Sequence, residues 1–266
     1  ASYDLVRKMR ASFLVMGPLL AKYGNAKVSL PGGCAIGDRP INIHLDGLKK
    51  MGVRFLIEDG YVIGQIDGAL KGAEINLPIR SVGATENIMM AATLALGRTK
   101  ISNAAKEPEI IDLGNFLQSM GAKISGLGTD EISVIGVSKL CGSEYSIMSD
   151  RIEAGTFILL VLGCSGFLKL TNLDEKVIDN YIKIFKPFKE LSLEKISDNK
   201  LLITCNSKNY RGSDVKTNPY PGFPTDLQAQ LSAVMSKAIG SSTIEETIFE
   251  NRFMHVAELN RMGAKM

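Results

Sequence analysis

One phrase recurs along the chain and limits the folds that are open to it. Residues Gly47–Arg54 return as Phe116–Lys123 and again as Glu258–Lys265, each copy with the pattern Leu-x-x-Met-Gly. The copies are separated by about 70 residues or twice that distance, which is typical of a repeated supersecondary unit. A further copy is therefore expected near residue 188, where Tyr181–Leu193 has a helix-like apolar pattern without the glycine.

A second phrase precedes each copy and gives the unit its order of elements. Gly24, Gly97, Gly166 and Gly240 each stand before a short strand-like stretch. Glycine tolerates the left-handed conformation in which helices often end. We therefore predict units that run helix, strand, loop, helix and further strands. Four such units in succession indicate an α/β fold built by repetition.

Length and composition place the chain among globular proteins with more than one domain. At 266 residues, with 45% apolar and 22% charged residues, it can bury a large core and is long enough for two domains. A boundary is expected in the polar stretch Glu144–Asp150, before an acidic helix start at Asp150–Gly155. This predicts domains at residues 1–148 and 149–266, with two units in each.

The same composition argues against several classes of partner. Lys and Arg are dispersed, the net charge is +3 and there is no Trp, so nucleic-acid binding is not expected. The apolar run Phe157–Leu170 is too short to cross a membrane. The four cysteines form no C-x-x-C pair, which argues against a zinc site and a disulfide scaffold and favours a reducing, cytoplasmic setting.

One loop of the repeat is enlarged. The interval from Val28 to Leu48 exceeds the matching intervals from Ile101 to Leu117 and from Ile244 to Leu259, and the extra residues are glycine-rich. Loops on a regular scaffold carry function more often than the scaffold does. The loop within residues 28–43 is therefore the first candidate for chemistry.

Cys34 is the reactive candidate in this loop. A free cysteine is commonly a small buried hydrophobe. Here Gly32 and Gly33 remove bulk beside the thiol, and Arg39 supplies a cation that favours the thiolate. The other three cysteines lie in or beside apolar runs and are interpreted as structural: Cys141, Cys164 and Cys205.

Two arginines and two helix starts are candidates for binding anions. Arg10 and Arg39 can each hold a phosphate or carboxylate by two hydrogen bonds, although an isolated arginine is often only a solvated surface residue. Pro40 can take the first position of a following helix, whose N-terminus suits an anion. Ser81–Ala92 resembles a glycine-containing loop that opens a helix, a weak phosphate signal.

Three groups of polar residues each have a functional and a structural interpretation. Asp226, at a helix start after two prolines, is either an N-cap or a general base. Glu107 and Glu109 occupy the loop that corresponds to the cysteine loop one unit later, as Glu250–His255 does three units later, and capping explains the two glutamates equally well. His44 and His255 are expected to serve packing, so a His-based triad or metal site is not predicted.

Taken together, these motifs resemble the UDP-N-acetylglucosamine 1-carboxyvinyltransferase family over essentially the whole chain. The segments that carry the resemblance are Lys8–Ser12, Leu30–Gly37, Arg39–Pro40, Ser81–Thr85, Asn103–Ile110, Asp150–Glu153, Phe223–Gln230 and Phe249–His255.

The resemblance implies a two-domain inside-out α/β barrel of six units, of which this chain has about four. It implies transfer of the enolpyruvyl group from phosphoenolpyruvate to the 3-hydroxyl of UDP-N-acetylglucosamine, with release of phosphate, in peptidoglycan and cell wall synthesis. Neither a metal nor an organic cofactor is implied, and the partners are the two small-molecule substrates.

The resemblance also assigns roles. Cys34 would handle phosphoenolpyruvate and react with fosfomycin, Asp226 would take the proton from the attacking hydroxyl, and Arg39 would act with them on the anionic groups. The residues implied in substrate binding are Arg10, Arg39, Pro40, Ile41, Asn42, Ile43, Ser81, Val82, Gly83, Asp226, Ile248 and Arg252.

Some features depart from the family pattern. Asn42 stands where some relatives have Asp, and Ile79 where some have Lys, with Arg80 adjacent. The family's Lys-Asn pair and a further Arg, near its two ends, have no counterpart, so we expect a piece of a longer enzyme that lacks flanking segments and is barely active alone. The alternatives are a non-catalytic fragment and the sister shikimate-pathway transferase, which lacks the cysteine-loop signature.

Overall fold

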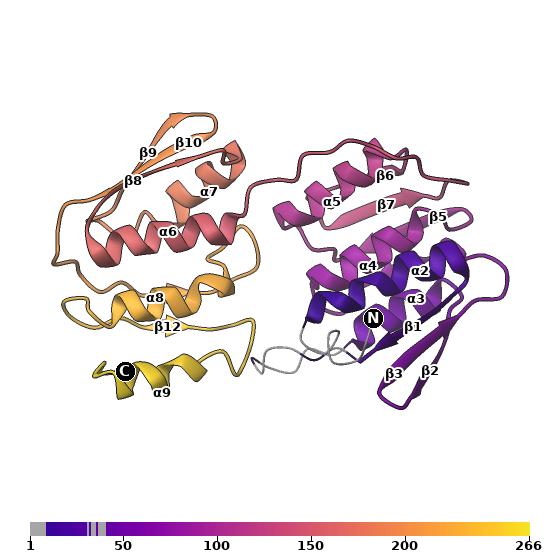
Figure 1. The fold of residues 1–266 in the computed structure, drawn as a ribbon, viewed down its shortest axis with the longest axis horizontal. Coiled ribbons are helices and arrows are strands. Elements are labelled where there is room, and N and C mark those ends of the chain that lie inside the picture. Colours follow the sequence, from indigo (N-terminus) through magenta and orange to yellow (C-terminus); the bar gives the residue numbers. More distant parts are fainter. Residues whose placement is uncertain (1–8, 31, 33–35, 37–40) are drawn as a thin grey trace. The chain divides into compact units, whose positions relative to one another are not determined.

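The structure is a computed structural model that describes residues 9–30, 32, 36 and 41–266. Its chain divides into two compact units (Figure 1). Of the described residues, unit 1 contains those up to Gly32 and from Ile41 to Ile147, and unit 2 contains Ile36 and Met148–Met266. The two units are described separately below.

Unit 1 contains two successive runs of helix, strand, helix, strand and strand. Its elements are η1 (Arg10–Val15), α2 (Met16–Tyr23), β1 (Asn25–Ser29), α3 (Asn42–Lys50), β2 (Arg54–Glu58), β3 (Tyr61–Gln65), β4 (Glu74–Asn76), α4 (Val82–Ala92), β5 (Arg98–Ser102), α5 (Pro108–Ser119), β6 (Lys123–Ser125) and β7 (Glu131–Ile135). The first run is α2 to β3 and the second is α4 to β7.

Unit 2 repeats this order from α6 to β10 and begins it again with α8, β12 and α9. Its elements are α6 (Arg151–Cys164), β8 (Gly166–Thr171), α7 (Glu175–Ile184), β9 (Ser192–Ser197), β10 (Lys200–Cys205), β11 (Val215–Lys216), η2 (Thr225–Leu227), α8 (Gln228–Met235), β12 (Ile244–Glu245) and α9 (Met254–Arg261). This is the order of elements expected from the two recurring phrases.

The recurring glycines have the backbone conformation that was predicted for them. Those before the strands all have positive φ: Gly24 73°, Gly97 91°, Gly166 116° and Gly240 89°. Gly52, Gly121 and Gly263 share a φ of 100°. The residue after each of these three returns a backbone hydrogen bond to the leucine of the phrase, as Ala122 does to Leu117 at 2.9 Å. The recurring phrase thus specifies one helix ending three times.

The copy of the unit expected near residue 188 is present with α7 as its second helix, but the extent suggested by the pattern over Tyr181–Leu193 is wrong. Helix α7 ends at Ile184, and strand β9 already begins at Ser192. The apolar residues after the helix form part of the core instead, because Phe185 and Phe188 are both buried with ring centroids 5.7 Å apart. Without a glycine to mark the helix end, apolar spacing alone placed the helix too late.

The sheets link one run of elements to the next. Antiparallel pairs join β1 to β3 and β3 to β2, and the same arrangement recurs in β5-β7-β6 and β8-β10-β9. Strand β4 follows β3 in sequence but pairs in parallel with β5, and β11 likewise pairs with β12. Helices α4 and α8 are the crossovers of these two parallel pairs.

Helix α4 is the centre of the core of unit 1, where it packs against α2, α3 and α5, with the sheets outside these helices (Figure 1). Ala84, Ile88 and Met89 on this helix are completely buried. Helix α2 approaches α4 closely at Gly17, where an added Cβ would lie 2.3 Å from the Asn87 carbonyl oxygen. Glycine is therefore required at this crossing.

Unit 2 is built around α6, whose sequence is apolar on most sides. Asp150 caps this helix as predicted, since its carboxylate accepts hydrogen bonds from the backbone N–H groups of Ile152 and Glu153. Phe185 is the centre of an aromatic group with Tyr181, Phe188 and Phe223. Among the described residues, no helix is long and apolar enough to cross a membrane.

Candidate functional site

Asp226 lies in the short helix η2, at the end of a loop held by the core. The buried ring of Phe223 packs edge-on against Phe185, and its carbonyl accepts a hydrogen bond from Asn218 N at 3.0 Å. Pro224 holds the N-cap position of η2, and no side chain caps this helix. The N-cap interpretation of Asp226 is therefore wrong, which leaves the carboxylate, 49% exposed, available for another partner.

That partner is Arg252, in the loop between β12 and α9. Its Nη2 donates to Asp226 Oδ1 at 2.7 Å, and its Nη1 donates to the Thr225 hydroxyl at 3.2 Å. The guanidinium also lies over the ring of Phe249, 5.5 Å from its centroid. Two predicted site residues are thus brought together, and the arginine is the more buried of the two at 18% exposed.

Glu246 supports this pair and was missed by the sequence analysis. Its carboxylate accepts four hydrogen bonds, from Thr217 Oγ1 (3.0 Å), Thr225 Oγ1 (2.8 Å), Ile248 N (2.8 Å) and Phe249 N (3.2 Å). Ile248, another predicted site residue, is therefore fixed through its backbone. The only signal for Glu246 in the sequence is its place at the start of the loop that contains Arg252.

In unit 1, the first turns of α3 and α4 lie against each other. Ser81 caps α4, because its hydroxyl accepts from Ala84 N at 3.3 Å. A Cβ added at Gly83 would lie 3.1 Å from His44 Cε1, so the start of α4 touches the first turn of α3. The described substrate-binding candidates Ile41, Asn42, Ile43, Ser81, Val82 and Gly83 therefore gather at two neighbouring helix N-termini, which suit an anion.

His44 serves packing, as expected, in the first turn of α3. Its ring is buried and packs edge-on against Phe13, and Nδ1 lies 3.2 Å from Asn87 Nδ2. Burial, and secondarily the charge of Arg10, lower the pKa of His44 to about 4. His44 is therefore neutral at pH 7, and the pairing with an amide N–H makes its Nδ1 an acceptor.

Three carboxylates gather at the starts of α4 and α5, and one of them was not singled out from the sequence. Burial, and secondarily the charges of Glu109 and Glu107, raise the pKa of Glu86 to about 7. Glu107 holds the N-cap position of α5, but its side chain makes no capping bond. The capping interpretation of Glu107 is therefore wrong, whereas Glu109 lies in the first turn of α5, where a negative charge is favourable.

Cys34, Arg39 and Pro40 lie outside the described residues. Ile36, in the same loop, is described, and its carbonyl accepts a hydrogen bond from Asn251 N at 2.9 Å. Strand β1 ends at Ser29 and helix α3 begins at Asn42, whereas only residues 103–107 separate β5 from α5 and only residues 246–253 separate β12 from α9. The predicted enlargement of the first loop is confirmed. Helix α3 begins at Asn42, later than the position of Pro40 implied.

The remaining cysteines and the second histidine have varied surroundings. Cys205 is buried, but Cys141 and Cys164 are exposed despite their apolar neighbours in sequence. His255 lies in α9, and its Nε2 is buried without a hydrogen-bond partner among the described residues. Burial and the charge of Arg252 lower the pKa of His255. No group of three His, Cys, Asp or Glu among the described residues is arranged to hold a metal ion.

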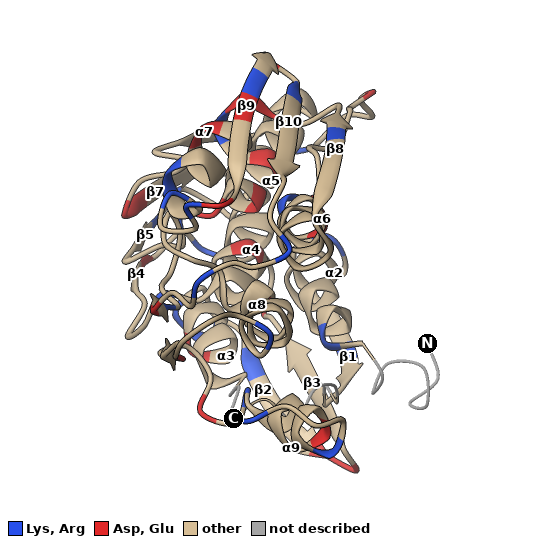
Figure 2. Ribbon diagram, turned by 90° about the vertical axis from the view of Figure 1, so that its left-hand side faces the viewer, with Lys and Arg blue, Asp and Glu red and all other residues tan. Residues whose placement is uncertain are grey.

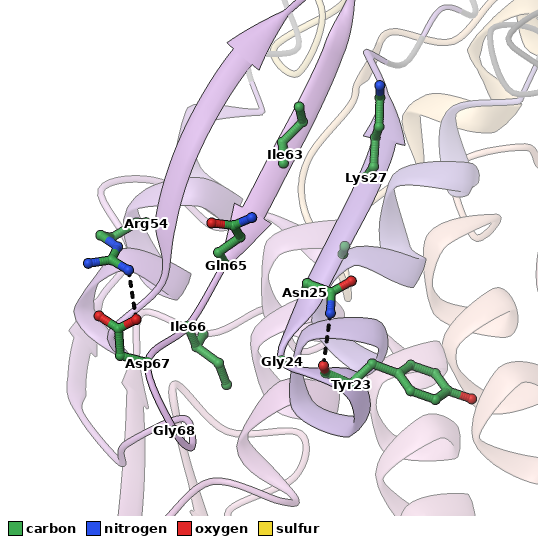
Figure 3. Close-up of a pocket in the computed structure, with 11 residues that line it drawn as sticks. Tyr23, Gly24, Asn25, Lys27, Arg54, Ile63, Gln65, Ile66, Asp67 and Gly68 are labelled. Carbon is green, nitrogen blue, oxygen red and sulfur yellow. Dashed lines mark hydrogen bonds and ion pairs between the residues drawn. The ribbon is translucent and has the colours of Figure 1, made fainter.

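A surface hollow of about 470 Å³ lies away from all of these candidates, on the outer face of the β1-β3-β2 sheet (Figure 3). Several of its charged and polar groups are already engaged: Arg54 pairs with Asp67 at 2.7 Å, and Asn25 donates to the Tyr23 carbonyl at 3.1 Å. The Lys27 ammonium lies over the Tyr61 ring. Figure 2 shows Lys and Arg interspersed with Asp and Glu along the described elements. Neither feature points to a second site.

Comparison with known proteins identifies the family. The family model of EPSP synthase (3-phosphoshikimate 1-carboxyvinyltransferase) matches residues 1–266. The chain belongs to the EPSP synthase family. Within this family it is 52% identical over 266 residues to UDP-N-acetylglucosamine 1-carboxyvinyltransferase of Granulibacter bethesdensis, covering 100% of this chain and 63% of that protein. The enzyme of the same name from Thermodesulfovibrio yellowstonii is 54% identical over 265 residues, covering 99% and 63%.

Two solved structures share the fold. The enolpyruvyl transferase NikO from Streptomyces tendae matches with a TM-score of 0.81 at 19% identity, over 97% of this chain and 61% of that one. EPSP synthase from Acinetobacter baumannii matches with a TM-score of 0.61 at 19% identity, over 93% and 58%. The chain therefore has the α/β enolpyruvyl transferase fold, present in part, and the resemblance inferred from its motifs is confirmed. It spans about 63% of the length of the curated relatives it matches.

Proposed function

We propose that this chain carries much of the catalytic machinery of a UDP-N-acetylglucosamine 1-carboxyvinyltransferase. The observation that carries the proposal is the Asp226–Arg252 pair, in which a half-exposed carboxylate and a largely buried guanidinium are held 2.7 Å apart. A general base needs such an accessible carboxylate, and an anionic substrate needs such a fixed cation. Identities of 52% and 54% to relatives of that name support this choice of reaction.

The proposed reaction joins two substrates without a cofactor. Asp226 takes the proton of the 3-hydroxyl of UDP-N-acetylglucosamine as its oxygen bonds to C2 of phosphoenolpyruvate, while C3 gains a proton. The resulting tetrahedral ketal then loses a proton from C3 and its phosphate, which leaves the enolpyruvyl ether. Cys34 gives or takes a proton in this sequence, and Arg39 and Arg10 bind the anionic groups of phosphoenolpyruvate.

Unit 1 is proposed to bind the nucleotide. The residues assigned to the uridine diphosphate are the segment Arg39–Ile43 together with Ser81, Val82 and Gly83. The contact between the starts of α3 and α4 supports this assignment, since the N-terminus of a helix favours an anion. In unit 2, Ile248 and Asp226 are assigned to the sugar and Arg252 to the anionic groups.

The sister reaction on shikimate is the weaker candidate. The family model is described by that reaction, but identity to the solved EPSP synthase is only 19%.

We further propose that the recurring runs of elements are four of six units of a two-domain inside-out barrel, with domains at residues 1–148 and 149–266. The enzyme is expected to work in the cytoplasm, where its substrates for cell wall synthesis are made.

The proposal is tested by product formation and by thiol labelling. The full-length protein should release phosphate from phosphoenolpyruvate only when UDP-N-acetylglucosamine is present, and Asp226→Asn should abolish release while UDP-N-acetylglucosamine still binds. Asp198→Asn, at an exposed site elsewhere in unit 2, is the control. Release that depends on shikimate 3-phosphate instead would overturn the proposal.

Fosfomycin provides a second test, independent of turnover. Its mass adduct should form faster with UDP-N-acetylglucosamine present and should be lost in Cys34→Ser. Cys164→Ser should retain the adduct, although Cys164 is an exposed thiol.

Because the chain spans about 63% of its relatives' length, we expect the 266-residue chain alone to release phosphate barely above background. Robust turnover by the chain alone would show that this expectation is wrong.

A further inference from the structure

The carboxylate of Glu246 accepts hydrogen bonds from four groups of the protein. It directly follows β12, and both of its oxygens are occupied, Oε1 by Thr217 Oγ1, Ile248 N and Phe249 N, and Oε2 by Thr225 Oγ1. An ionised carboxylate only accepts hydrogen bonds and has about four acceptor sites. The four donors therefore satisfy Glu246 in its charged form.

The hydroxyl of Thr225 connects Glu246 to the candidate active site, and the donor and the acceptor of each hydrogen bond in this connection are fixed. Its single hydrogen points to Glu246 Oε2 at 2.8 Å, because a carboxylate cannot donate. Its oxygen then accepts from Arg252 Nη1 at 3.2 Å, because a guanidinium cannot accept. Arg252 Nη2 in turn donates to Asp226 at 2.7 Å. A chain of hydrogen bonds thus runs from the carboxylate of Glu246 through Thr225 and Arg252 to the carboxylate of Asp226. We call this chain the relay.

We propose that Glu246 is a positioning residue for this reaction, which acts through Thr225 and Arg252 on the carboxylate of Asp226. This inference rests on the proposed role of Asp226 as the base. Through Thr225, Glu246 fixes one nitrogen of the guanidinium, so that the other nitrogen faces Asp226. Through the N–H groups of Ile248 and Phe249 it also fixes the segment that leads to Arg252 and the ring beneath its guanidinium.

Misplacing a reacting group by about 1 Å can cost about a hundredfold in rate. In the full-length protein, Glu246→Gln should therefore lower kcat by about tenfold to a hundredfold. Glu245→Gln is the matched control, since this neighbour pairs with Lys216 and lies outside the relay. Its kcat should stay at the wild-type value.

A double-mutant cycle separates positioning from simple loop support. Thr225→Val keeps the shape of the side chain but removes the hydroxyl, whereas Thr225→Ser keeps the hydroxyl and should restore kcat. If Glu246 acts through Thr225, combining Glu246→Gln with Thr225→Val should cost little more than either change alone. If their effects on kcat simply multiply, Glu246 only supports the loop and the inference is wrong.

The outcomes also distinguish this inference from the proposed function. If Asp226→Asn keeps full turnover, the proposed base is wrong and the relay has no catalytic target. If Asp226→Asn abolishes turnover but Glu246→Gln and Thr225→Val keep the wild-type kcat, the proposed function stands and only the positioning role falls. Since Thr225→Val only replaces the hydroxyl with a methyl group, it tests the relay even if Glu246→Gln does not fold.

Discussion

The side-chain amide of Asn87 lies 3.2 Å from Nδ1 of His44 and joins four helices of unit 1. Its Oδ1 accepts from Gly17 N at 2.7 Å, and its Nδ2 also donates to the Phe13 carbonyl at 3.1 Å. Asn87 is completely buried, so no water can replace these partners. The starts of α3 and α4, where the nucleotide is proposed to bind, are therefore held by one side chain that the sequence analysis did not single out.

His44 should make the protein less stable in mild acid. The pKa of His44 is about 4 in the folded protein and 6.5 in the unfolded chain. Between these values the unfolded chain is protonated to a greater extent than the folded protein, so acid favours unfolding. The contribution to the free energy of unfolding is intact above pH 6.5 and falls by about 3 kcal/mol as the pH drops to 4. Urea unfolding of wild type and His44→Gln across this range measures it, and a constant difference between the two proteins would contradict it.

Glu86 should act in the opposite direction. Its pKa is about 7 when folded and 4.5 when unfolded, so its contribution is intact below pH 4.5 and is lost as the pH rises through 7. Glu86→Gln should therefore stabilise the protein at pH 8, by up to about 3 kcal/mol, relative to its effect at pH 4. Thermal unfolding at both pH values checks this, with the exposed Glu144→Gln as control. An equal effect of Glu86→Gln at both values would count against it.

Gly121 should be costly to replace for conformational reasons alone. Its φ is 100°, and an added Cβ would meet nothing within 4 Å, so only backbone strain opposes a side chain. Gly121→Ala should lower the free energy of unfolding by about 1–2 kcal/mol. Gly142→Ala, where space is equally open and φ lies outside the positive range, should change it by less than about 0.5 kcal/mol. Equal costs at the two positions would show that strain at Gly121 is not the cause.

Arg252 should not be replaceable by lysine. Two different nitrogens of its guanidinium bind Thr225 and Asp226, and an ammonium on a flexible stem cannot reproduce that fork. We expect Arg252→Lys to lower kcat/KM by about a hundredfold in the phosphate-release assay. Arg261→Lys, in the exposed ion pair with Glu258, is the control and should keep the wild-type value. Wild-type activity of Arg252→Lys would show that the charge alone suffices.

What the sequence predicted well was local and repeated. The helix ends at Gly52, Gly121 and Gly263 depend on one residue type at one φ, so identical phrases gave identical structures. The long first loop followed from the same comparison. The predicted extent of the helix near residue 188 was wrong, because the glycine is absent there. Apolar residues at helical spacing also occur where a chain without a helix packs into the core.

What the sequence did not predict depends on contacts between distant segments. Asp226 looked like an N-cap because its partner Arg252 lies in another loop, and Glu246 had no local feature to mark it. Glu86 gains its high pKa from burial and from two carboxylates on α5, neither of which its own segment reveals. Hydrogen-bond partners of this kind are set by the tertiary fold.

The exchange of strands between successive runs limits how this fold can come apart. Strand β4 follows the first run in sequence but completes the sheet of the second run, and β11, which follows β10, likewise pairs with β12. Removing one run together with the strand that follows it would leave an edge of the next run's sheet unpaired. The segment that recurs along this chain is therefore smaller than the segment expected to unfold cooperatively, and hydrogen exchange should protect neighbouring runs together.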